Sequence, residues 1–562
     1  MRSSGREVAG FDTEDDGQGN PFLWCITHES GRYHARTANE FLERLSRMGE
    51  DARARGRTLE LWATNLEYDL CNTFGPERIS EVALRFGRSA LVGARWRRIE
   101  LRDTMRHVPA SVAELGELVG LRKREGDLFS AKRSRNFRRY LTRCQRDASI
   151  TYRFATLLRE GYARFKMAPK MTLASTALAI WREGFWKRET VRPSPEIWSA
   201  AFEAYHGGRT QAFAAGTFPD VRAIDAASMF PWAMIARPLP LPWGLYRRVR
   251  RGARVYANGI YDVRVRSNVA LPVLPVRTKA GTVYPNGEWR AWYVGEELLA
   301  AMERGVSVYV HQGFEFAEQC EPFKGYVAKM FALKQRARGV NRLLFKLLLN
   351  ALYGKFGQRG RVVRAMPLAK FMELETAPLE WRAWNGLAIF SEEGTPPPWS
   401  NMVWPAFVTA RARVRLLAEM ERVRAAGGRV LYCDTDSAFF TGAKRLRYPG
   451  KATRPGTFEN RGTFRSLLLV GKKEYALQRG ANVWDIHAKG VPYAERMRYL
   501  REGIAEFDRP TRLREAARGG LKPNVWRRVR KQRRVSLIEG ASQRDGALPV
   551  PRITRGGNVS RK

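Results

Sequence analysis

The sequence predicts a chain of several domains with mixed α/β and α+β architecture. At 562 residues it is longer than a single domain usually is, and 44% of its residues are hydrophobic, which is enough for large cores. Strand-like runs that contain carboxylates, such as VRAIDAASMFP and VLYCDTDSAFF, are separated by a long helical block, FKGYVAKMFALKQRARGVNRLLFKLLLNALYGKFG. This order is typical of sheets covered by helices.

The first part of the chain has a similar order. A strand-like run leads into GFDTEDDG, a second leads into NLEYD, and a basic helical stretch, RRYLTRCQRDASITYRFATLL, comes later. Pro169, Pro193 and Pro195 interrupt the helical pieces that follow, which indicates a domain junction around residues 165 to 200. We therefore expect one domain at 1–168 and a second, larger part at 169–562.

The charge of the chain indicates a polyanionic partner. Ninety-nine Lys and Arg residues against 56 Asp and Glu residues give a formal net charge of +43. This excess is far more than solubility requires, and it causes strong self-repulsion in the free protein. Nucleic acid is the partner that such a charge favours.

Cysteine usage and hydropathy predict a cytoplasmic protein, in the host cytoplasm if the source is viral. The cysteines are odd in number and widely spaced, without a C-x-x-C pair, which favours neither disulfides nor a zinc site: Cys25, Cys71, Cys144, Cys320 and Cys433. The first ten residues, MRSSGREVAG, lack the apolar core of a signal peptide. No apolar run approaches the roughly 20 residues of a membrane span.

The stretch VLYCDTDSAFF places two carboxylates two residues apart within a run of β-forming residues. Because side chains alternate along a strand, Asp434 and Asp436 are expected to project to the same side. Two like charges so close repel each other unless a cation lies between them, and a metal ion is the natural candidate. The alternative is a solvated β-hairpin tip, since Asp-Thr-Asp-Ser is also turn-forming.

Asp225 is a third carboxylate that could join this pair. It ends an apolar strand in VRAIDAASMFP and is followed by a turn-capable segment closed by Pro231. An aspartate at a strand end is usually a cap, so the assignment to a metal site depends on the folded sheet bringing Asp225 beside Asp434 and Asp436.

The helical block between these strands has two different faces. The residues at i, i+4, i+8 and i+11 form a basic and aromatic face: Arg342, Lys346, Asn350 and Tyr353. The opposite face is apolar: Leu344, Leu348 and Leu352. Lys334, which precedes Gly339 on an expected antiparallel helix, can reach the same phosphate. Simple solvation explains the polar face equally well, but Lys and Arg for a triphosphate and Tyr for a base edge suit nucleotide selection.

DAASMFP, KLLLNALYG and YCDTDS, in this order, resemble motifs A, B and C of family B DNA polymerases. The resemblance implies a right-hand polymerase with a palm at about 200–320 and 400–500, fingers at about 321–357 and a thumb at about 500–562. It also implies that Asp225 and Asp436 hold two Mg²⁺ ions, with Mn²⁺ as an alternative, and that Asp434 supports them.

Further residues take roles from the same resemblance. Lys346, Lys334 and Arg342 are expected to neutralise the triphosphate, and Tyr353 to pack on the nascent base pair. Asn350, on the same face, is a further nucleotide-binding candidate. Phe230 stands where the family usually has a tyrosine as the sugar gate, and its ring should still exclude a 2′-hydroxyl. GKKEYALQ and YHGGRTQAF resemble K-x-Y and Y-x-G-G elements that bind DNA: Lys473, Tyr475, Tyr205, Gly207 and Gly208.

The first domain resembles an RNase H-like 3′-5′ exonuclease of the DEDD type. FDTED supplies Asp12 and Glu14, NLEYD supplies Asp69, and RCQRDASIT supplies Asp147. Four carboxylates around two metal ions would activate a water against the terminal phosphodiester. The alternative is an acid-rich loop at 12–16 that binds nothing. The residues expected to hold the single strand are Asn65, Tyr68, Thr104 and Met105.

One position departs from the exonuclease pattern. The family has a tyrosine four residues before the last aspartate, and this chain has Arg143 there. Tyr140 lies nearly on the same helix face but about one turn further away, so either it replaces the missing tyrosine or the nuclease is slow.

The compact length most resembles the protein-primed branch of the family, from terminal-protein phages and linear plasmids. This implies template and primer DNA, dNTPs and a terminal protein as partners, processive strand-displacing synthesis, and a monomer without membrane contact. Two insertions are expected, the first at about 240–320 and the second at about 358–400. The first insertion looks short. The runner-up is a DNA- or RNA-primed enzyme. A single-strand binder with decayed sites would have lost carboxylates that this chain retains.

Overall fold

The computed structural model describes residues 5–87, 91–124, 133–278, 281–374, 381–384, 387–512, 515–516, 523–533, 552–553 and 559–560. The chain forms two compact units. Unit 1 consists of Met1–Lys187, Ala328–Pro397 and Asp508–Arg528, and unit 2 of Arg188–Val327, Pro398–Phe507 and Val529–Lys562. Within the described residues, no helix combines the length and the apolar content that a membrane crossing requires.

These units do not follow the order of the chain. The first boundary falls at 187/188, within the junction region expected from the prolines. Residues 328–397, which cover most of the expected fingers and second insertion, group with the N-terminal segment in unit 1. The bounds of the palm, fingers and thumb stay predictions.

Unit 1 is built on a seven-stranded mixed sheet with the order β3-β2-β1-β4-β7-β6-β5. Its strands are β1 (Arg6–Asp15), β2 (Pro21–His28), β3 (Gly31–Ala35), β4 (Thr58–Ala63), β5 (Val82–Phe86), β6 (Leu91–Trp96) and β7 (Ile99–Asp103). Strand β1 is parallel to β4, which is parallel to β7, whereas β1 and β2 are antiparallel. The carboxyl ends of β1, β4 and β7 therefore lie at the same edge of the sheet.

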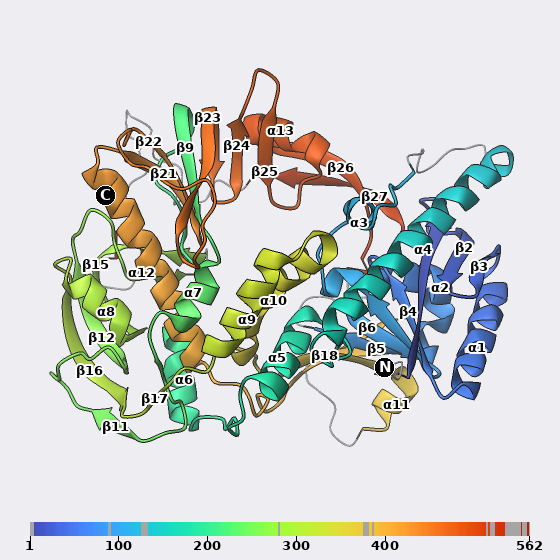
Figure 1. Cartoon of the computed structure of the whole chain (residues 1–562), viewed down its shortest axis with the longest axis horizontal. Helices are drawn as coiled ribbons and strands as arrows, with labels where there is room; N and C mark the ends of the chain where they lie inside the picture. The colour runs from blue at the N-terminus through green and yellow to red at the C-terminus, as the bar shows by residue number, and fades with distance from the viewer. Residues whose placement is uncertain are drawn as a thin grey trace. The chain divides into compact units, whose positions relative to one another are not determined.

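Helix α4 lies along β1 and β2 (Figure 1). The helices of this part are α1 (Ala38–Ala54), α2 (Leu66–Arg78), α3 (Val112–Val119), α4 (Arg133–Ala163) and α5 (Leu173–Gly184), with 3-10 turns η1 (Ile79–Glu81) and η2 (Thr104–Arg106). A Cβ at Gly10 of β1 would lie 2.4 Å from the backbone of Ala148 and Tyr152 in α4. Glycine thus allows a close helix–sheet contact, which brings Asp147 of α4 next to Asp12 of β1.

The predicted helical block forms two helices, α9 (Lys324–Arg336) and α10 (Gly339–Phe356). Leu344, Leu348 and Leu352 are completely buried, as the face pattern predicted. Helix α10 packs against α4 and α5 within unit 1. The contact with α4 is close, because a Cβ at Gly161 would lie 2.6 Å from Leu344.

The segment expected to be the second insertion has a fold of its own within unit 1. It contains β18 (Arg361–Pro367), α11 (Leu368–Met372), β19 (Trp381–Trp384) and β20 (Leu387–Glu393). The strands form an antiparallel sheet in the order β18-β20-β19. Phe371 of α11 packs against Trp381 and Phe390, and β18 packs against β5.

Unit 2 contains a seven-stranded antiparallel sheet with the order β25-β24-β23-β9-β22-β21-β8. The strands are β8 (Thr210–Ala212), β9 (Gly216–Ala226), β21 (Arg429–Asp434), β22 (Ser437–Thr441), β23 (Phe458–Gly471), β24 (Glu474–Gln478) and β25 (Trp484–Ala488). Strand β9 lies in the middle, between β22 and β23, so its carboxyl end meets the tip of the β21–β22 hairpin.

Helix α12 is the most buried helix of unit 2 and packs against α6, α7, α8 and β21. The helices are α6 (Pro195–Ala204), α7 (Met229–Ile235), α8 (Gly295–Met302), α12 (Val403–Ala425) and α13 (Tyr493–Glu502). Arg413 of α12 forms a fully buried ion pair of 2.6 Å with Glu297 of α8. Its guanidinium also donates to the carbonyls of His206 and Gly207, which fixes the loop before β8.

Most of residues 239–320, together with two short strands near the end of the chain, form structure outside the sheet of β9. The elements are β10 (Leu239–Pro240) paired with β17 (Gln319–Cys320), a hairpin of β13 (Val276–Thr278) and β14 (Gly281–Val283), and a sheet in the order β11-β16-β12-β15-β28-β29. That sheet contains β11 (Tyr246–Val249), β12 (Gly259–Ser267), β15 (Asn286–Val294), β16 (Ser307–Phe316), β28 (Arg552–Ile553) and β29 (Val559–Ser560). A further pair is β26 (Ile504–Pro510) with β27 (Trp526–Gln532).

Candidate active sites

The sheet of unit 2 brings Asp225, Asp434 and Asp436 together. Asp225 lies near the end of β9, and it pairs across the ladder with Ser437 of β22. The amide of Ala226 donates to the carbonyl of Asp436 at 2.7 Å, and Asp434 is the last residue of β21. Residues that are about 210 positions apart in the chain thus meet at one end of the sheet.

The expected strand alternation of Asp434 and Asp436 is wrong, because the strand ends at Asp434. Thr435 adopts a left-handed φ of 63°, and the amide of Asp436 donates to the carbonyl of Asp434 at 2.6 Å. The pair therefore lies at a hairpin tip, which was the structural alternative. The tip lies beside Asp225 rather than isolated in solvent, so this geometry keeps the three carboxylates together.

Asp434 is held by hydrogen bonds from several donors. Its carboxylate accepts from the hydroxyls of Thr210 at 2.8 Å and Thr435 at 3.1 Å, and from Tyr432 at 3.3 Å. The ammonium of Lys473 lies 3.1 Å from the same carboxylate. These contacts hold Asp434 in place, and its supporting role stays a prediction.

The environment of Asp436 perturbs its carboxyl group. Burial and the charges of Asp225 and Asp434 raise its pKa to about 7. A carboxyl group whose pKa is raised by burial and by anionic neighbours ionises more readily beside a divalent cation. The donor set of Asp225 and Asp436 therefore fits Mg²⁺, which prefers carboxylate oxygens.

Arg461 of β23 contacts this cluster and was missed in the sequence. Its guanidinium donates to the carboxylate of Asp225 at 2.5 Å. The two residues are 236 positions apart, and no motif connects them. Nothing in the sequence around Arg461 indicates that this arginine contacts Asp225.

The Y-x-G-G element lies directly against the hairpin tip. The amide of Thr435 donates to the carbonyl of Arg209 at 2.6 Å, and a Cβ at Gly208 would lie 2.7 Å from the side chain of Thr435. Gly208 is therefore required for the contact with Thr435, whereas its expected role was an approach to DNA. A Cβ at Gly207 would meet nothing within 4 Å, and Tyr205 is half-buried at the end of α6.

Lys473 and Tyr475 of the K-x-Y element lie close to Tyr432. Lys473 has a left-handed φ of 61° in the β23–β24 turn, and its amide donates to the hydroxyl of Tyr432 at 3.1 Å. The ring of Tyr475 packs against Tyr432 and His487, with centroids 5.3 and 4.6 Å away. The element is thus joined to the residue that holds Asp434.

The nucleotide-binding candidates belong to both units. In unit 1, Arg342 and Lys346 of α10 are exposed, and Asn350 and Tyr353 are half-buried. The amide group of Asn350 donates to the carbonyl of Lys346 at 2.9 Å. Lys334 of α9 lies over the ring of Phe331, 5.0 Å from its centroid. In unit 2, Phe230 is the second residue of α7 and is half-buried.

A second carboxylate cluster lies in unit 1, where β1, α2 and α4 meet. Asp12 and Glu14 lie on β1, Asp69 on α2 and Asp147 on α4. Burial raises the pKa of Asp12, and the charges of Asp147, Asp69 and Glu14 raise it further. Asp69 accepts from the hydroxyl of Thr13 at 2.7 Å, which fixes α2 against β1.

Two cations and two unbonded oxygens characterise this cluster. Arg143 donates to Glu14 at 3.1 Å, and Lys123 donates to Asp147 at 2.6 Å. Burial raises the pKa of Glu14 to about 7 although Arg143 opposes the shift, and burial also raises the pKa of Asp147 against Lys123. Glu14 Oε1 and Asp147 Oδ1 are buried without a hydrogen-bond partner. Such orphaned oxygens fit a divalent cation. Lys123 was also missed in the sequence.

Arg143 reaches the carboxylates. The ring of Tyr140 packs in a hydrophobic cluster with Leu23 and Cys25, edge-on to Phe22. The guanidinium of Arg143 is buried against Glu14, with 10% of its side chain exposed. The departure from the family pattern therefore places a cation inside the cluster.

The single-strand candidates differ in accessibility. Thr104 is completely buried and donates its hydroxyl to Thr64 at 3.0 Å, so a direct DNA contact by this side chain does not fit the structure. Met105 is half-buried. Asn65 is exposed at a left-handed φ of 74°. The hydroxyl of Tyr68 donates to Asp15 at 2.5 Å.

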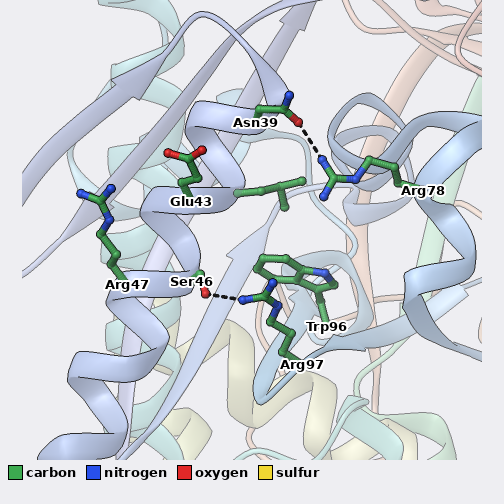
Figure 2. A pocket seen from close by; sticks show the side chains of 8 residues that line it. Asn39, Glu43, Ser46, Arg47, Arg78, Trp96 and Arg97 are labelled. Carbon is green, nitrogen blue, oxygen red and sulfur yellow. Dashed lines mark hydrogen bonds between the residues drawn. The ribbon is translucent and has the colours of Figure 1, made fainter.

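A pocket of about 330 Å³ lies elsewhere in unit 1 and contains none of the candidate residues. Figure 2 shows Arg78 bonded to Asn39 and Arg97 bonded to Ser46, beside Trp96. In a chain with a net charge of +43, a surface hollow lined by arginines is expected without a dedicated ligand. We assign no role to this pocket.

Glu7, His28 and Glu29 form the one group of three, among the described residues, whose ligand-type atoms all lie within 4.8 Å of one another. Arg55 binds both oxygens of Glu7, and Arg57 lies 3.6 Å from the same carboxylate. Two guanidinium groups oppose a cation at this position. The two aspartate-rich clusters also have cationic partners, and among the described residues their ligand atoms lie further apart, so the sequence motifs are what favour these clusters as metal sites.

Comparisons with known proteins agree with the sequence motifs. A family model described as DNA polymerase type B, organellar and viral, matches residues 130–374. A probable DNA polymerase of Podospora anserina is 27% identical over 202 residues, which cover 35% of this chain and 17% of that protein. The DNA polymerase of Bacillus phage Nf is 25% identical over 318 residues, which cover 51% of this chain and 50% of that protein. The DNA-directed DNA polymerase of Enterobacteria phage PRD1 is 26% identical over 303 residues, which cover 52% of this chain and 52% of that protein.

The matched region of this chain thus spans between 17% and about half the length of these relatives. Solved structures extend the likeness in fold. The structure titled Phi29 DNA polymerase complexed with primer-template DNA has a TM-score of 0.73 at 16% identity, covering 94% of this chain and 99% of that chain. A ternary complex with incoming nucleotide substrates has a TM-score of 0.71 at 17% identity, covering 94% and 99%. These matches confirm the predicted fold.

Proposed function

Because the chain resembles the organellar and viral type B DNA polymerases in sequence and has the fold of the phi29 enzyme, we propose that it is a DNA-directed DNA polymerase. It adds dNTPs to a primer 3′-hydroxyl by phosphoryl transfer with two metal ions. The observation that carries this proposal is the meeting of Asp225 and Asp436 at the end of the unit 2 sheet.

Asp225 and Asp436 are the residues that would hold Mg²⁺, with Mn²⁺ as an alternative. When bound, these ions lower the charge repulsion between the primer hydroxyl and the triphosphate and stabilise the leaving pyrophosphate. Asp434 positions the hairpin tip through Thr210 and Thr435. The residues of the chain thus keep two ligands in place and orient them.

The basic face of α10 would bind the incoming nucleotide. Arg342 and Lys346, with Lys334 of α9, supply cations for the triphosphate, since guanidinium and ammonium groups pair readily with phosphate. Asn350 and Tyr353 on the same face would contact the nascent base pair, and Phe230 would exclude the ribose 2′-hydroxyl by its ring.

Template and primer would contact the elements around the hairpin tip. The candidates are Tyr205, Gly207, Gly208, Lys473 and Tyr475. Lys473 has a side chain 52% exposed beside Asp434, so it can contact a phosphate without leaving this carboxylate. The net charge of +43 supports a long contact with DNA.

We further propose a 3′-5′ exonuclease in unit 1. Asp12, Glu14, Asp69 and Asp147 would hold two Mg²⁺ ions, and the orphaned oxygens of Glu14 and Asp147 support this assignment. When bound, the ions would supply an activated water for hydrolysis of the terminal phosphodiester. Asn65, Tyr68 and Met105 would hold the single strand, and the buried Thr104 would support this segment through its hydrogen bond to Thr64.

Protein priming by a terminal protein, processivity and strand displacement are parts of the same proposal. They are supported by likeness to phage polymerases and by the folded segment at β18–β20 in the expected second insertion. The alternative is a DNA- or RNA-primed enzyme of the same family. We also propose a monomer, and we propose a cytoplasmic location, since all five cysteines are free and buried, as suits a reducing compartment.

Primer extension on a long circular single-stranded template, with and without a competing strand, tests this function. We expect templated incorporation of dNTPs that depends on Mg²⁺ and continues through the competing strand. Absence of incorporation with every primer type, including a protein hydroxyl, would contradict the proposal. Incorporation that stops at the competing strand would retain the polymerase and remove strand displacement.

A further inference from the structure

Arg461 lies on a β-bulge that aims it at the carboxylate cluster of unit 2. In the pairing of β23 with β9, Asn460 is opposite Ile224 and Gly462 is opposite Ala223, so Arg461 is the extra residue. The amide of Gly462 donates to the side chain of Asn460 at 3.0 Å, and Gly462 has a φ of 120°. Bulges commonly re-aim a side chain beside an active site.

The contact of Arg461 is with a proposed metal ligand. Its guanidinium donates to Asp225 Oδ2 at 2.5 Å, and it lies 3.9 Å from Glu459. The side chain of Arg461 is 53% exposed, and that of Asp225 is 22% exposed. An ion pair with this exposure contributes little to stability, so stability does not explain the bulge.

The charges around the cluster are already largely balanced by the sheet itself. Lys473 lies on Asp434, and Arg461 lies on Asp225. Two of the three carboxylates thus have a cationic partner from β23 or the β23–β24 turn. A divalent ion that binds Asp225 meets a guanidinium at the same carboxylate.

We propose that Arg461 is an internal counter-cation that competes with the divalent metal for Asp225 and is released toward phosphate when metal and nucleotide bind. The inference rests on the proposed polymerase function. A guanidinium that leaves a carboxylate keeps its charge and pairs well with a triphosphate or a primer phosphate. Metal binding to the free protein is therefore weak, and it is coupled to the arrival of the nucleotide.

The test is a titration of the free protein with Mn²⁺, followed by electron paramagnetic resonance of the unbound ion, without DNA or nucleotide. The protein carries Asp12→Ala and Glu14→Ala, so that the carboxylates of unit 1 do not add a second site. In this background, Arg461→Gln is expected to tighten Mn²⁺ binding by about 2- to 5-fold, the range that the loss of a partly exposed charged pair implies. Arg461→Lys should give an intermediate value.

The matched control is Arg465→Gln, which removes one charge from an exposed position on the same strand. It should change the Mn²⁺ dissociation constant by less than about twofold, since it lacks the contact with Asp225. Equal constants for Arg461→Gln and Arg465→Gln would overturn the inference. The inference would also be overturned if neither the background protein nor the Arg461→Gln variant bound Mn²⁺.

Failure of the polymerase proposal has a different result in the same titration. Asp436→Asn should abolish Mn²⁺ binding whichever residue is at position 461. If Asp436→Asn binds Mn²⁺ as the background protein does, the proposed polymerase metal site is wrong. If Asp436→Asn abolishes binding and Arg461→Gln has no effect, the metal site stands and only the role of Arg461 is removed.

Discussion

Single residues decide how each carboxylate cluster is charged. In unit 1, Arg143 replaces the tyrosine of the family pattern and lies on Glu14 at 3.1 Å. An arginine is always cationic and cannot accept a proton, so it cannot act on a water as a tyrosine does, and its charge opposes a cation at Glu14 although Oε1 stays unbonded. The exonuclease is therefore expected to be weaker than its four carboxylates suggest.

Arg143→Tyr should raise the rate of single-strand degradation by roughly tenfold, because it removes the cation from Glu14 and restores a hydroxyl. The measurement is the hydrolysis of a labelled single strand, with primer extension as an independent readout that should not change. Arg139→Tyr, an exposed position one turn earlier in α4, is the control and should leave the rate unaltered. If the Arg143→Tyr variant degrades the single strand at the same rate as the parent protein, the proposed role of this arginine is wrong.

At the scale of elements, the sequence motifs predicted which segments meet but not their local geometry. The buried leucines of α10 followed from helical periodicity, and the order of the three polymerase motifs placed Asp225 and Asp436 in one site. The left-handed Thr435 was not predicted, since the apolar run around it favours a continuous strand. Arg461 and Asp225 are 236 positions apart, and Arg143 and Glu14 are 129 apart, and only the folded sheets bring them together.

The hairpin tip and the Y-x-G-G loop give a prediction with an internal control. Gly208→Ala places a Cβ 2.7 Å from Thr435 and should displace the turn between Asp434 and Asp436. Primer extension should fall by at least about tenfold, because a small misplacement of ligands is costly in catalysis. The control is Gly184→Ala at the end of α5, which adds its methyl group to open space at a position without a proposed role and should keep the activity. Similar rates for both variants would contradict the proposed contact.

At the scale of the whole molecule, two buried histidines couple stability to pH. Burial lowers the pKa of His107 to about 3 and that of His206 to about 2. Between these values and about 6.5, the unfolded chain binds protons that the folded chain does not bind. The free energy of unfolding therefore decreases as the pH falls below about 6.5, by about 1.4 kcal/mol per pH unit for each histidine.

Urea unfolding at pH 7.5 and pH 5.5 measures this effect. His107→Gln should reduce the difference in unfolding free energy between the two pH values by about 1.4 kcal/mol, whatever it does to stability at pH 7.5. His34→Gln, at an exposed position, should leave the difference unchanged. A pH dependence that is the same in both variants would show that folding does not lower the pKa of His107.

The net charge of +43 predicts a strong dependence of DNA binding on salt. If the contact neutralises on the order of 6 to 10 phosphates, the affinity for a primer–template should fall by roughly 10³ to 10⁵ between 50 and 200 mM salt. Fluorescence anisotropy with a labelled duplex gives this slope. A nearly flat dependence would contradict an extended basic contact.

The most direct measurement of the central claim is one labelled primer–template incubated with Mg²⁺, with and without dNTPs, for the parent and two variants. With dNTPs, the parent should lengthen the primer, and without them it should shorten it. Asp436→Asn should lose only the lengthening, and Asp12→Ala combined with Glu14→Ala should lose only the shortening, because each set of carboxylates belongs to one site. If Asp436→Asn lengthens the primer within tenfold of the parent, the account of the polymerase site is wrong.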